Sequence, residues 1–354
     1  SDSDGGTPLS TAEMIGDDAE ETMDGFDFTE TWNITMGGEA SYPFLRSNTE
    51  KPAPGLQDPL YAGQNGTATD PYKIENWYNL DSVRQKPGAN FTVVADLNET
   101  TEGYGEVVET PLNGFDPIGD SGSAFTGSFT GRNYIISNLS INRSAEDYVG
   151  LFGYVGTDGT VNNASLLDVN VTGGANVGGL VGHNSGTISL SSTNGTVTAT
   201  DTNVGGIVGY ATTSSAVTES YSTAHVTGTH YVGGLVGQNN GAVEHTYAVG
   251  TVSGSGSDVG GLVGYNDRQG AVTDAYWDIN STEQDSSAAG TGLATTQLQG
   301  DFAESNTNLN FTDTWDAVDN VSNGYRVSYP YFQNNSKLPP PGLRSLYAGG
   351  RGTT

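Results

Sequence analysis

Apolar residues along this chain recur with a fixed long period. The hexapeptide at Val149 reads VGLFGY, and VGGLVG or VGGIVG begins at Val177, Val204, Val232 and Val259. The starting valines are therefore 28, 27, 28 and 27 residues apart (149→177→204→232→259). A period between about 20 and 50 residues is typical of stacked repeat proteins, in which each unit buries its apolar face only against its neighbours.

Each period holds three short strand-like segments joined by turns. In the repeat that starts at Val204 these segments read VGGIVG, AVTESY and AHVTG, with ATTSS as a turn. Short strands at this spacing predict one coil of a solenoid with backbone ladders between coils. We therefore predict an all-β protein, a parallel β-helix (β-solenoid) of about 6–7 coils. The glycine pair Gly178–Gly179 either bends its strand or lets another backbone approach closely, and the sequence leaves both readings open.

A short helix is predicted before the repeats. Asn76 is a favourable N-cap, Trp77, Leu80 and Val83 have helical spacing, and Lys86–Gly88 (KPG) predicts the helix end. We expect this helix to cover one end of the stack, because an exposed strand edge would pair with other chains. The first strand is predicted at residues 91–97.

Residues 99–124 are predicted to form a long loop between that strand and the repeats. They read ETTEGYGEVVETPLNGFDPIGDSGSA up to Ala124, with scattered apolar residues and several glycines. Such a stretch has neither the alternation of a strand nor the spacing of a helix.

The two ends of the chain resemble each other. Tyr42-Pro43 matches Tyr329-Pro330, and the PGL at Pro54 matches the PGL at Pro341, both with an offset of 287 residues. The flanking text also agrees, TPLSTAEMIGDDAE with TGLATTQLQGDFAE and FTETW with FTDTW. We therefore divide the chain into an N-terminal junction module (residues 1–60), a capped solenoid (61–290) and a C-terminal cap and junction module (291–354).

The duplicated ends predict end-to-end contact between units. The chain opens with the closing module of one unit and has LYAG near its end, at Leu346 as at Leu60, so it resembles a slice of a head-to-tail array or a unit built to join one. A plain ancient duplication is the alternative. The residues predicted to make assembly contacts are Trp32, Tyr42, Pro43, Trp315, Tyr329 and Pro330.

The strongly negative net charge limits the classes of partner that the protein can bind. The formal net charge is -29, from 41 Asp plus Glu against 12 Lys plus Arg. This balance disfavours nucleic acid and anionic membranes, because phosphate binding needs clustered cations. Molar salt would screen the self-repulsion of such a surface, which favours a salt-loving source. There is no cysteine and no apolar run of membrane-spanning length, so we expect the protein not to span a membrane.

Sequons indicate secretion. Thirteen Asn-x-Ser/Thr sites favour an extracellular glycoprotein, although an Asn- and Thr-rich chain generates some by chance. The start of the chain has no basic and apolar signal region, as expected of a mature or excised chain. The candidate sites are Asn33, Asn65, Asn90, Asn98, Asn138, Asn142, Asn163, Asn170, Asn194, Asn280, Asn310, Asn320 and Asn334.

The repeats resemble the GLUG motif, a short repeat of secreted and surface proteins of bacteria and archaea. The matching segments begin at Gly178, Gly205, Gly233 and Gly260, and Val149–Tyr154 is a looser copy. The stretch DPYKIENWYNLDSVR also resembles the leader that precedes such repeats in haloarchaeal surface proteins. The resemblance covers roughly residues 60–290 and implies a surface or adhesin-like role without a particular chemistry.

Two columns of side chains are the main candidates for chemistry. Tyr221, Tyr247 and Tyr276 are equivalent in successive repeats, as are the residues two positions earlier, Glu219, His245 and Asp274. We interpret the tyrosines as a structural ladder and keep a sugar-binding platform as the alternative. The two acids could sit roughly 10 Å apart across two coils, close to the separation of a glycosidase pair.

Other chemistries find less support. A lyase acting on anionic sugars needs cations, and Arg268 is the only Lys or Arg between Ser144 and Tyr325. The histidines lack metal-ligand spacing, and His183 is predicted to lie in a solvated turn. We predict no catalytic, cofactor or metal residues, although structural calcium could bind acidic loops such as SDSDGG or the one at Asp158.

The sequence thus predicts an extracellular structural protein that assembles head to tail into a filament or tandem array. A surface adhesin that binds glycans or neighbouring cells is the alternative, and a carbohydrate-active β-helix enzyme is the third reading. The expected partner is the protein itself.

Overall fold

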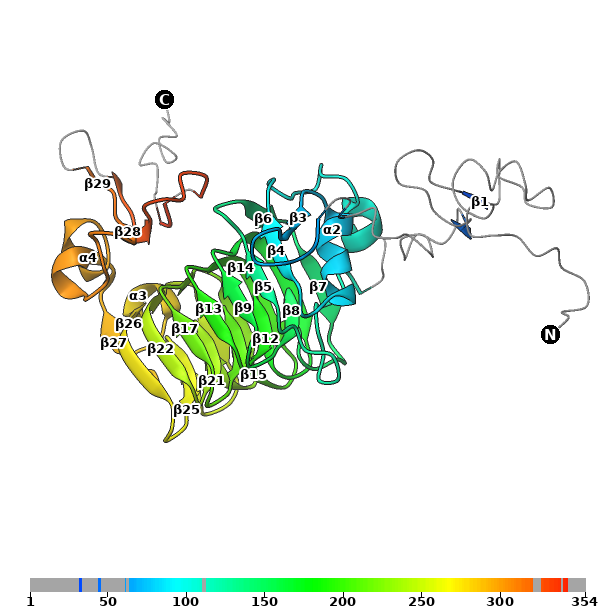
Figure 1. Ribbon diagram of the computed structural model, residues 1–354. Coiled ribbons are helices and arrows are strands. Elements are labelled where there is room, and N and C mark those ends of the chain that lie inside the picture. Colours follow the sequence, from blue (N-terminus) through cyan, green and yellow to red (C-terminus); the bar gives the residue numbers. More distant parts are fainter. Residues whose placement is uncertain are drawn as a thin grey trace, which may run out of the picture.

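The fold is a parallel β-solenoid with a C-terminal module along its side (Figure 1). The computed structural model describes residue 61 and residues 64–109, 113–320, 326–338 and 340–342, together with the strand backbones β1 (Trp32–Asn33) and β2 (Phe44–Leu45). Every strand pairing within the solenoid sheets is parallel, as the repeat period predicts.

The largest sheet has sixteen strands and forms two adjoining strips. One strip contains β3 (Tyr72–Ile74), β4 (Asn90–Val93), β5 (Ser128–Thr130), β9 (Thr160–Asn162), β13 (Thr187–Ser189), β17 (Ala216–Thr218) and the first halves of β22 (Ala242–Ala248) and β26 (Ala271–Asp278). The other contains β6 (Ile135–Ser137), β7 (Ser140–Arg143), β10 (Ser165–Gly173), β14 (Ser192–Ala199), β18 (Tyr221–Ser222), β19 (His225–Gly228), β23 (Val252–Gly254) and β27 (Thr291–Leu293), together with the second halves of β22 and β26.

Two smaller sheets complete the solenoid. The five-stranded sheet contains β8 (Phe152–Val155), β12 (Val181–Asn184), β16 (Val208–Ala211), β21 (Val236–Asn239) and β25 (Val263–Asn266). The four-stranded sheet contains β11 (Val177–Gly178), β15 (Thr202–Gly205), β20 (His230–Gly233) and β24 (Val259–Gly260). Each turn therefore holds more short strands than the three predicted segments.

The predicted fold class is confirmed, but the solenoid has fewer turns than the predicted six to seven. The sheet β8-β12-β16-β21-β25 gives five turns that carry this face. Strands β3, β4 and β5 extend the first strip beyond those five turns without a counterpart in the small sheets. The helix and the long connections of residues 75–124 take the place of complete coils there.

The glycine pairs of the repeat make a corner. Strand β11 ends at Gly178, a bend follows, and β12 begins at Val181, so that Val177, Leu180 and Val181 are all fully buried. A Cβ atom on Gly178 would lie 2.1 Å from the carbonyl oxygen of Val181, and one on Gly179 would lie 2.6 Å from that of Gly206. Both readings left open by the sequence hold, because the strand bends and backbones approach closely.

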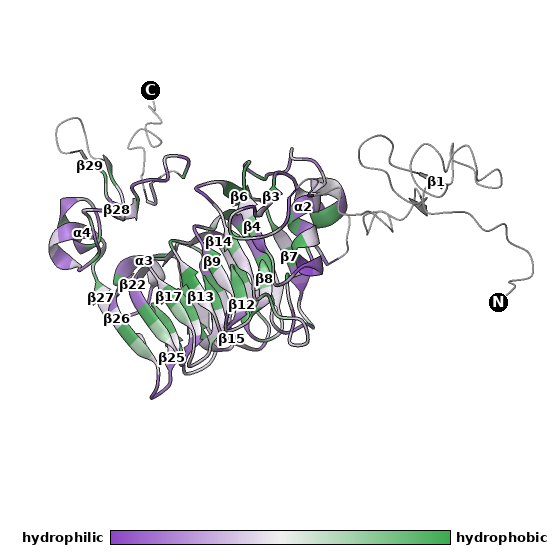
Figure 2. Cartoon of the chain, in the orientation of Figure 1, coloured by the Kyte–Doolittle hydropathy of each residue, from purple (hydrophilic) through white to green (hydrophobic). Residues whose placement is uncertain are grey.

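One continuous apolar core fills the solenoid. Val161, Ile188, Val217 and Val243 stack in register along the first strip and have no exposed surface. Figure 2 shows apolar and polar residues alternating along these strands. Burying such a side chain contributes about 1.5–3 kcal/mol, and the contribution recurs at every turn.

The predicted helix lies at the N-terminal end of the stack (Figure 1). Helix α2 (Trp77–Ser82) begins after Asn76, whose side chain accepts a hydrogen bond from the Asn79 backbone at 2.9 Å, and continues into the 3-10 turn η3 (Val83–Gln85). Trp77 and Leu80 are fully buried in the solenoid core. The helix thus caps the apolar interior, as predicted.

The connection predicted as a loop at residues 99–124 contains some structure. A π-helical turn, η4 (Gly105–Glu109), lies within it, and isolated bridges pair Gly114 with Ile141 and Ile118 with Phe152. Phe115 and Ile118 are fully buried. Their burial explains why the connection follows the solenoid surface rather than projecting from it.

The short helix α3 (Ile279–Thr282) follows the last coil and leads to the C-terminal module. The module includes η5 (Thr295–Gln297), α4 (Asp301–Asn306), β28 (Trp315–Asp316), β29 (Asp319–Asn320), β30 (Arg326–Val327) and β31 (Tyr331–Phe332). Strands β28 and β31 pair antiparallel, as do β29 and β30.

Candidate functional site: the tyrosine ladder and its docked module

A ladder of tyrosines lies on the outer side of the last three turns. Tyr221 pairs in register with Tyr247, and Tyr247 pairs with Tyr276. The rings of Tyr221 and Tyr247 stack at 5.1 Å with an interplanar angle of 3°. Outward-facing rings would normally be exposed, yet these three are 4%, 0% and 6% exposed. Another part of the chain must therefore cover them.

The C-terminal module provides that cover. The Trp315 ring lies 5.9 Å from the Tyr221 ring and 5.6 Å from the Tyr247 ring, and Phe332 lies 5.1 Å from Tyr221. These residues belong to a second apolar cluster, separate from the solenoid core. The cluster comprises Tyr221, Tyr247, Val249, Tyr276, Leu293, Leu298, Leu309, Trp315, Tyr329 and Phe332.

Polar groups fix the position of the module. The Trp315 indole N–H donates to Glu219 Oε2 at 2.5 Å, and the Tyr329 hydroxyl donates to Asp278 Oδ2 at 2.5 Å. The Tyr247 hydroxyl donates to the backbone oxygen of Pro330. These donors and acceptors are largely buried while the module is docked. Undocking would break each of these hydrogen bonds and leave its donor and acceptor to bond with water.

Burial keeps the tyrosines in their neutral, hydrogen-donating form. It raises the pKa of Tyr221 to about 12 and holds the pKa of Tyr247 well above its ordinary value. The pKa of Tyr329 is also raised, first by burial and then by its hydrogen bond to Asp278. The hydroxyls of Tyr247 and Tyr329 therefore stay protonated, as donors to Pro330 and Asp278, further into the alkaline range than an exposed tyrosine would.

The module reaches beyond the ladder toward the first turns. The Asn335 side chain donates to Ser165 Oγ at 3.1 Å. Lys337 Nζ lies 3.0 Å from Asp96 Oδ1 and 3.7 Å from the centre of the Tyr134 ring. The module therefore runs along one side of the solenoid, as Figure 1 shows.

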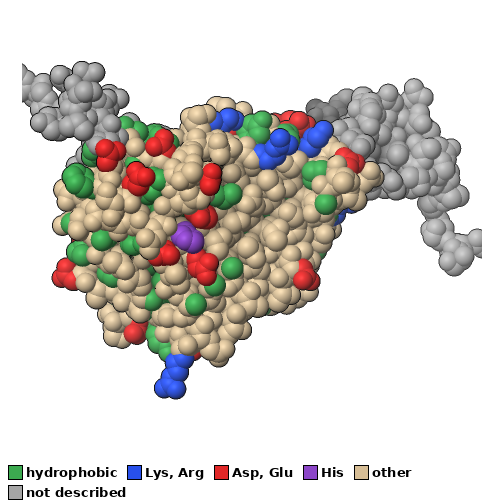
Figure 3. Space-filling model, turned by 60° about the vertical axis from the view of Figure 1, so that its left-hand side comes forward, with side chains coloured by type: hydrophobic (Ala, Val, Ile, Leu, Met, Phe, Trp, Pro, Cys, Tyr) green, Lys and Arg blue, Asp and Glu red, His purple; other side chains and the backbone are tan. Residues whose placement is uncertain are grey.

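The carboxylate column lies at the edge of this docked surface. His245 Nδ1 is 3.8 Å from Glu219 Oε1, and His245 Nε2 is 3.7 Å from Asp274 Oδ2. Figure 3 shows a histidine among acidic side chains on this face. Glu219 already accepts from Trp315, and Asp274 Oδ1 accepts from the Asn308 side chain at 2.6 Å. Both carboxylates thus hold the module to the solenoid, a structural role that sequence analysis did not find.

An aromatic column runs along the outer face of the five-stranded sheet. His183 lies on strand β12, in register with Tyr154 and Tyr210, so the prediction of a solvated turn is wrong. Its ring stacks on Tyr154 at 3.9 Å with an interplanar angle of 15°. This half-buried stack lowers the pKa of His183 to about 4 by desolvation. The outward position on a strand, not a turn, explains why aromatic residues recur in this column.

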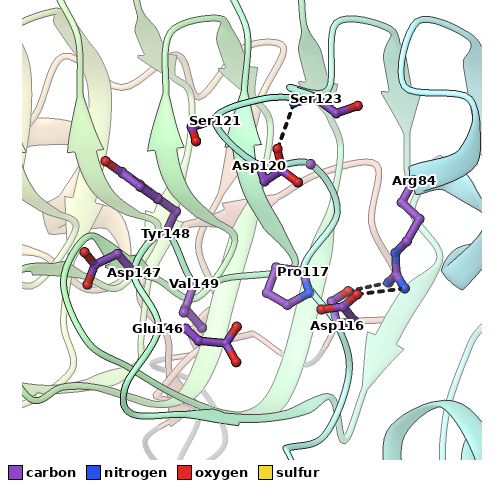
Figure 4. Close-up of a pocket in the computed structure, with 11 residues that line it drawn as sticks. Arg84, Asp116, Pro117, Asp120, Ser121, Ser123, Glu146, Asp147, Tyr148 and Val149 are labelled. Atoms are coloured by element: carbon purple, nitrogen blue, oxygen red, sulfur yellow. Dashed lines mark hydrogen bonds and ion pairs between the residues drawn. The ribbon is translucent and has the colours of Figure 1, made fainter. Parts of the chain in front are cut away.

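A polar pocket lies near the first turns (Figure 4). Asp116 and Glu146 line it, and both pair with Arg143 at 3.1 and 3.0 Å. Arg84 pairs with Asp116 at 3.3 Å, and Asp120 accepts from the backbone of Gly122 and Ser123. These groups satisfy one another and tie the loop after Gly114 to the solenoid.

The predicted glycosylation sites differ in exposure. Exposed asparagines are Asn65, Asn142, Asn170, Asn280, Asn310 and Asn334. Half-buried ones are Asn90, Asn98, Asn138, Asn163 and Asn194. The side chains of Asn33 and Asn320 lie outside the described residues.

The predicted assembly residues fall into two groups. Trp315, Tyr329 and Pro330 are buried against the solenoid of their own chain. Tyr42 and Pro43 lie outside the described residues, and Trp32 is described only as backbone in β1. The structure thus brings the C-terminal set together on the tyrosine ladder, which sequence analysis had treated as a separate feature. The sequence contains a signal for this contact, because the column has tyrosines only in the three turns that come just before the C-terminal module.

Among the residues that the structure describes, no group of three or more His, Asp or Glu side chains could hold a metal ion. Asp158 belongs to this part of the chain, whereas the SDSDGG segment lies outside it. Within the same residues, no helix is long and apolar enough to cross a membrane.

The fold and the docked module define a class: a repeat-built parallel β-solenoid closed by a module on its side. Residues 228–253 match the GLUG motif family, which confirms the resemblance of the repeats. The chain is 32% identical over 306 residues to halomucin of Haloquadratum walsbyi, an alignment that covers 73% of this chain. It is 38% identical over 134 residues to an Evansella cellulosilytica protein with the provisional name Gly-rich membrane protein, covering 36% of this chain.

The chain spans about 3% of halomucin and 15% of the Evansella protein. Among solved structures, a Bacteroides ovatus protein provisionally described as an immunoglobulin A1 protease matches with a TM-score of 0.57. The match covers 78% of this chain and 96% of that one at 22% identity. At this identity the likeness concerns the fold alone.

Proposed function

We propose that this protein is a non-enzymatic, extracellular structural protein of a salt-rich environment, in which solenoids are joined head to tail through the duplicated modules. The docked C-terminal module carries the proposal, because its Trp315 and Phe332 pack on the tyrosine ladder at the side of the solenoid. The same module stands a second time at the N-terminal end of the sequence. A unit with two such modules can contact its own solenoid with one and, where the ladder of a neighbouring solenoid is free, contact that neighbour with the other.

The net charge and the similar proteins support a salt-rich environment and a location at the cell surface. A net charge of -29 keeps such rods apart and soluble at high salt. Halomucin, a relative at 32% identity, comes from the haloarchaeon Haloquadratum walsbyi. The sequons and the relative named as a membrane protein support a place at the cell surface.

The arrangement of acids supports a non-catalytic role. The two acids of the ladder column hold the docked module, and Asp116 and Glu146 of the polar pocket pair with arginines. A general acid or base needs access to a substrate proton. Carboxylates engaged in this way contribute to structure.

Electron microscopy of the native protein at high salt tests the assembly. Filaments or chains whose axial repeat equals one solenoid are expected. Dispersed particles with the 36.8 kDa sequence mass plus glycan would contradict head-to-tail assembly and favour the adhesin reading.

Glycan binding is the second candidate, and the aromatic column of Tyr154, His183 and Tyr210 favours it. These rings lie on an outward sheet face at the spacing of the turns. Aromatic rings suit the apolar faces of sugars. Glycan-array binding that is lost on Tyr210→Ala, with unchanged circular dichroism, would support adhesion over a purely structural role.

A further inference from the structure

We propose that residues 7–56 are the closing module of a second solenoid and bind its tyrosine ladder, as residues 291–342 bind the ladder of this one. The partner is a GLUG solenoid with tyrosines at the positions of Tyr221 and Tyr247, and a second copy of this chain provides it. The inference rests on the proposed function and names the surface through which it would operate.

The strand pairing of the two modules is the same. In the C-terminal module Trp315 pairs with Phe332 and Asp316 with Tyr331. In the N-terminal module Trp32 pairs with Leu45 and Asn33 with Phe44. FTETW precedes the first pair at an offset of 283 residues, and SYP precedes the second at 287. The two modules therefore share a hairpin, with four residues more between its strands in the C-terminal copy (287 − 283).

The apolar contact residues are retained in the N-terminal sequence. The module's contribution to the second apolar cluster is Leu293, Leu298, Leu309, Trp315, Tyr329 and Phe332. Aligned by the matching segments, the corresponding residues are Leu9, Met14, Phe26, Trp32, Tyr42 and Leu45. Each position keeps an apolar or aromatic side chain, as required of a surface that covers tyrosine rings.

The polar contact residues are largely retained. Trp32 has the indole N–H that Trp315 donates to Glu219, and Tyr42 has the hydroxyl that Tyr329 donates to Asp278. Asn335, which donates to Ser165, corresponds to Asn48. Asn308, which donates to Asp274, corresponds to Gly25, so this bond would be missing in the N-terminal module.

One ladder accepts one module. Within the solenoid, the positions equivalent to Tyr221 in the two preceding turns are Ser192 and Ser165, so those turns offer no ring. The rings of Tyr221 and Tyr247 are already covered by Trp315 and its neighbours. The two modules must therefore compete for a ladder, and the N-terminal one binds where the C-terminal one is displaced. The missing Asp274 contact favours the C-terminal module.

The full-length variant Trp315→Ala/Tyr329→Ala tests the inference, because it removes the main contacts of the C-terminal module and frees the ladder. Light scattering at high salt should then show a mass of at least twice 36.8 kDa, rising with concentration. Adding Trp32→Ala/Tyr42→Ala should return the protein to the monomer. Adding Tyr247→Ala, which alters the acceptor surface instead, should do the same.

Two outcomes would overturn the inference: a freed chain that stays monomeric, or association that persists without Trp32 and Tyr42. Circular dichroism must show that the solenoid is intact. If the alanine variant does not fold, Trp315→Phe/Tyr329→Phe keeps an aromatic ring at each position, removes both hydrogen-bond donors and is read in the same way. Dispersed wild-type particles together with Trp32-dependent association of the freed chain would refute head-to-tail assembly of the native protein but support the docking surface.

Discussion

Residues with positive φ mark one corner of every turn. Asn163, Leu190, Glu219, His245 and Asp274 follow each other at equivalent positions, with φ of 54°, 50°, 44°, 51° and 48°. This conformation costs a residue with a Cβ about 1–2 kcal/mol. Backbone pairing with the neighbouring turns holds this conformation. The conformation also directs the side chains of Glu219 and Asp274 toward the docked module. The corner that shapes the coil thus also presents the polar contacts.

Replacing Gly178 by alanine is expected to destabilise the solenoid by about 1–3 kcal/mol, as overpacking does. The added Cβ would meet backbone oxygen at 2.1 Å, which no side-chain movement relieves. Denaturant unfolding of Gly178→Ala measures the loss. Gly105→Ala is the matched control, because a Cβ there has no atom within 4 Å. Equal stability of the two variants would contradict the close approach at the repeat corner.

His183 is expected to make the folded protein sensitive to acid. Its folded pKa of about 4 lies below the ordinary value of 6.5, so the unfolded state binds a proton first as the pH falls. Its contribution to stability is complete above about pH 6.5 and is lost between there and about pH 4. His183→Gln, which copies Gln238 of a later turn, should flatten this part of the stability profile measured by denaturant unfolding at constant salt. An unchanged profile would show that the ring is not desolvated.

The strands and the helix α2 are stabilised in different ways. The strands are short, and each gains stability from its neighbours in adjacent turns rather than from its own length. Helix α2 has six residues and could not persist alone. Its cap at Asn76 and its buried Trp77 and Leu80 hold it on the end of the stack.

Loss of the cap at Asn76 should therefore loosen the N-terminal end. Asn76→Ala leaves the Asn79 N–H without its acceptor and is expected to cost about 1 kcal/mol. Asn76→Ser restores an acceptor and should recover most of that loss. Amide hydrogen exchange in residues 72–97, compared with exchange in β16, would locate the effect. A uniform change along the whole solenoid would contradict a local capping role.

At the scale of the whole molecule, charge and shape act together. Among the described residues, Arg84, Arg143 and Lys337 form ion pairs with carboxylates, and most of the carboxylates in this part of the chain have no such Lys or Arg partner. A rod with net charge -29 repels itself along its length. Salt at molar concentration shortens the Debye length to about 3 Å and removes this repulsion.

The thermal unfolding midpoint should therefore rise with salt concentration. Sodium chloride and potassium chloride should act alike, because screening depends on ionic strength rather than on a bound ion. Differential scanning calorimetry at increasing concentrations of each salt measures the shift. A protein that stays folded and soluble for days without salt would remove the main support for a halophilic origin.

The sequence by itself determined the fold class. Apolar positions that recur every 27 or 28 residues can all be buried when each repeat forms one coil and stacks on its neighbours. The sequence also located the helix cap at Asn76 and the tyrosine column of Tyr221, Tyr247 and Tyr276, since local hydrogen bonding and register follow directly from spacing. The number of complete turns could not be predicted, because residues 75–124 lack the repeat and pack by individual contacts of side chains such as Phe115.

Only the tertiary structure decided what covers the tyrosines. Trp315 and Glu219 are 96 residues apart in sequence, and no periodicity links an irregular segment to a repeat. Their contact depends on the solenoid presenting three rings at one side and on the module returning along that side. The sequence could identify the two copies of the module and the ladder separately, but only the fold brought a module and the ladder together.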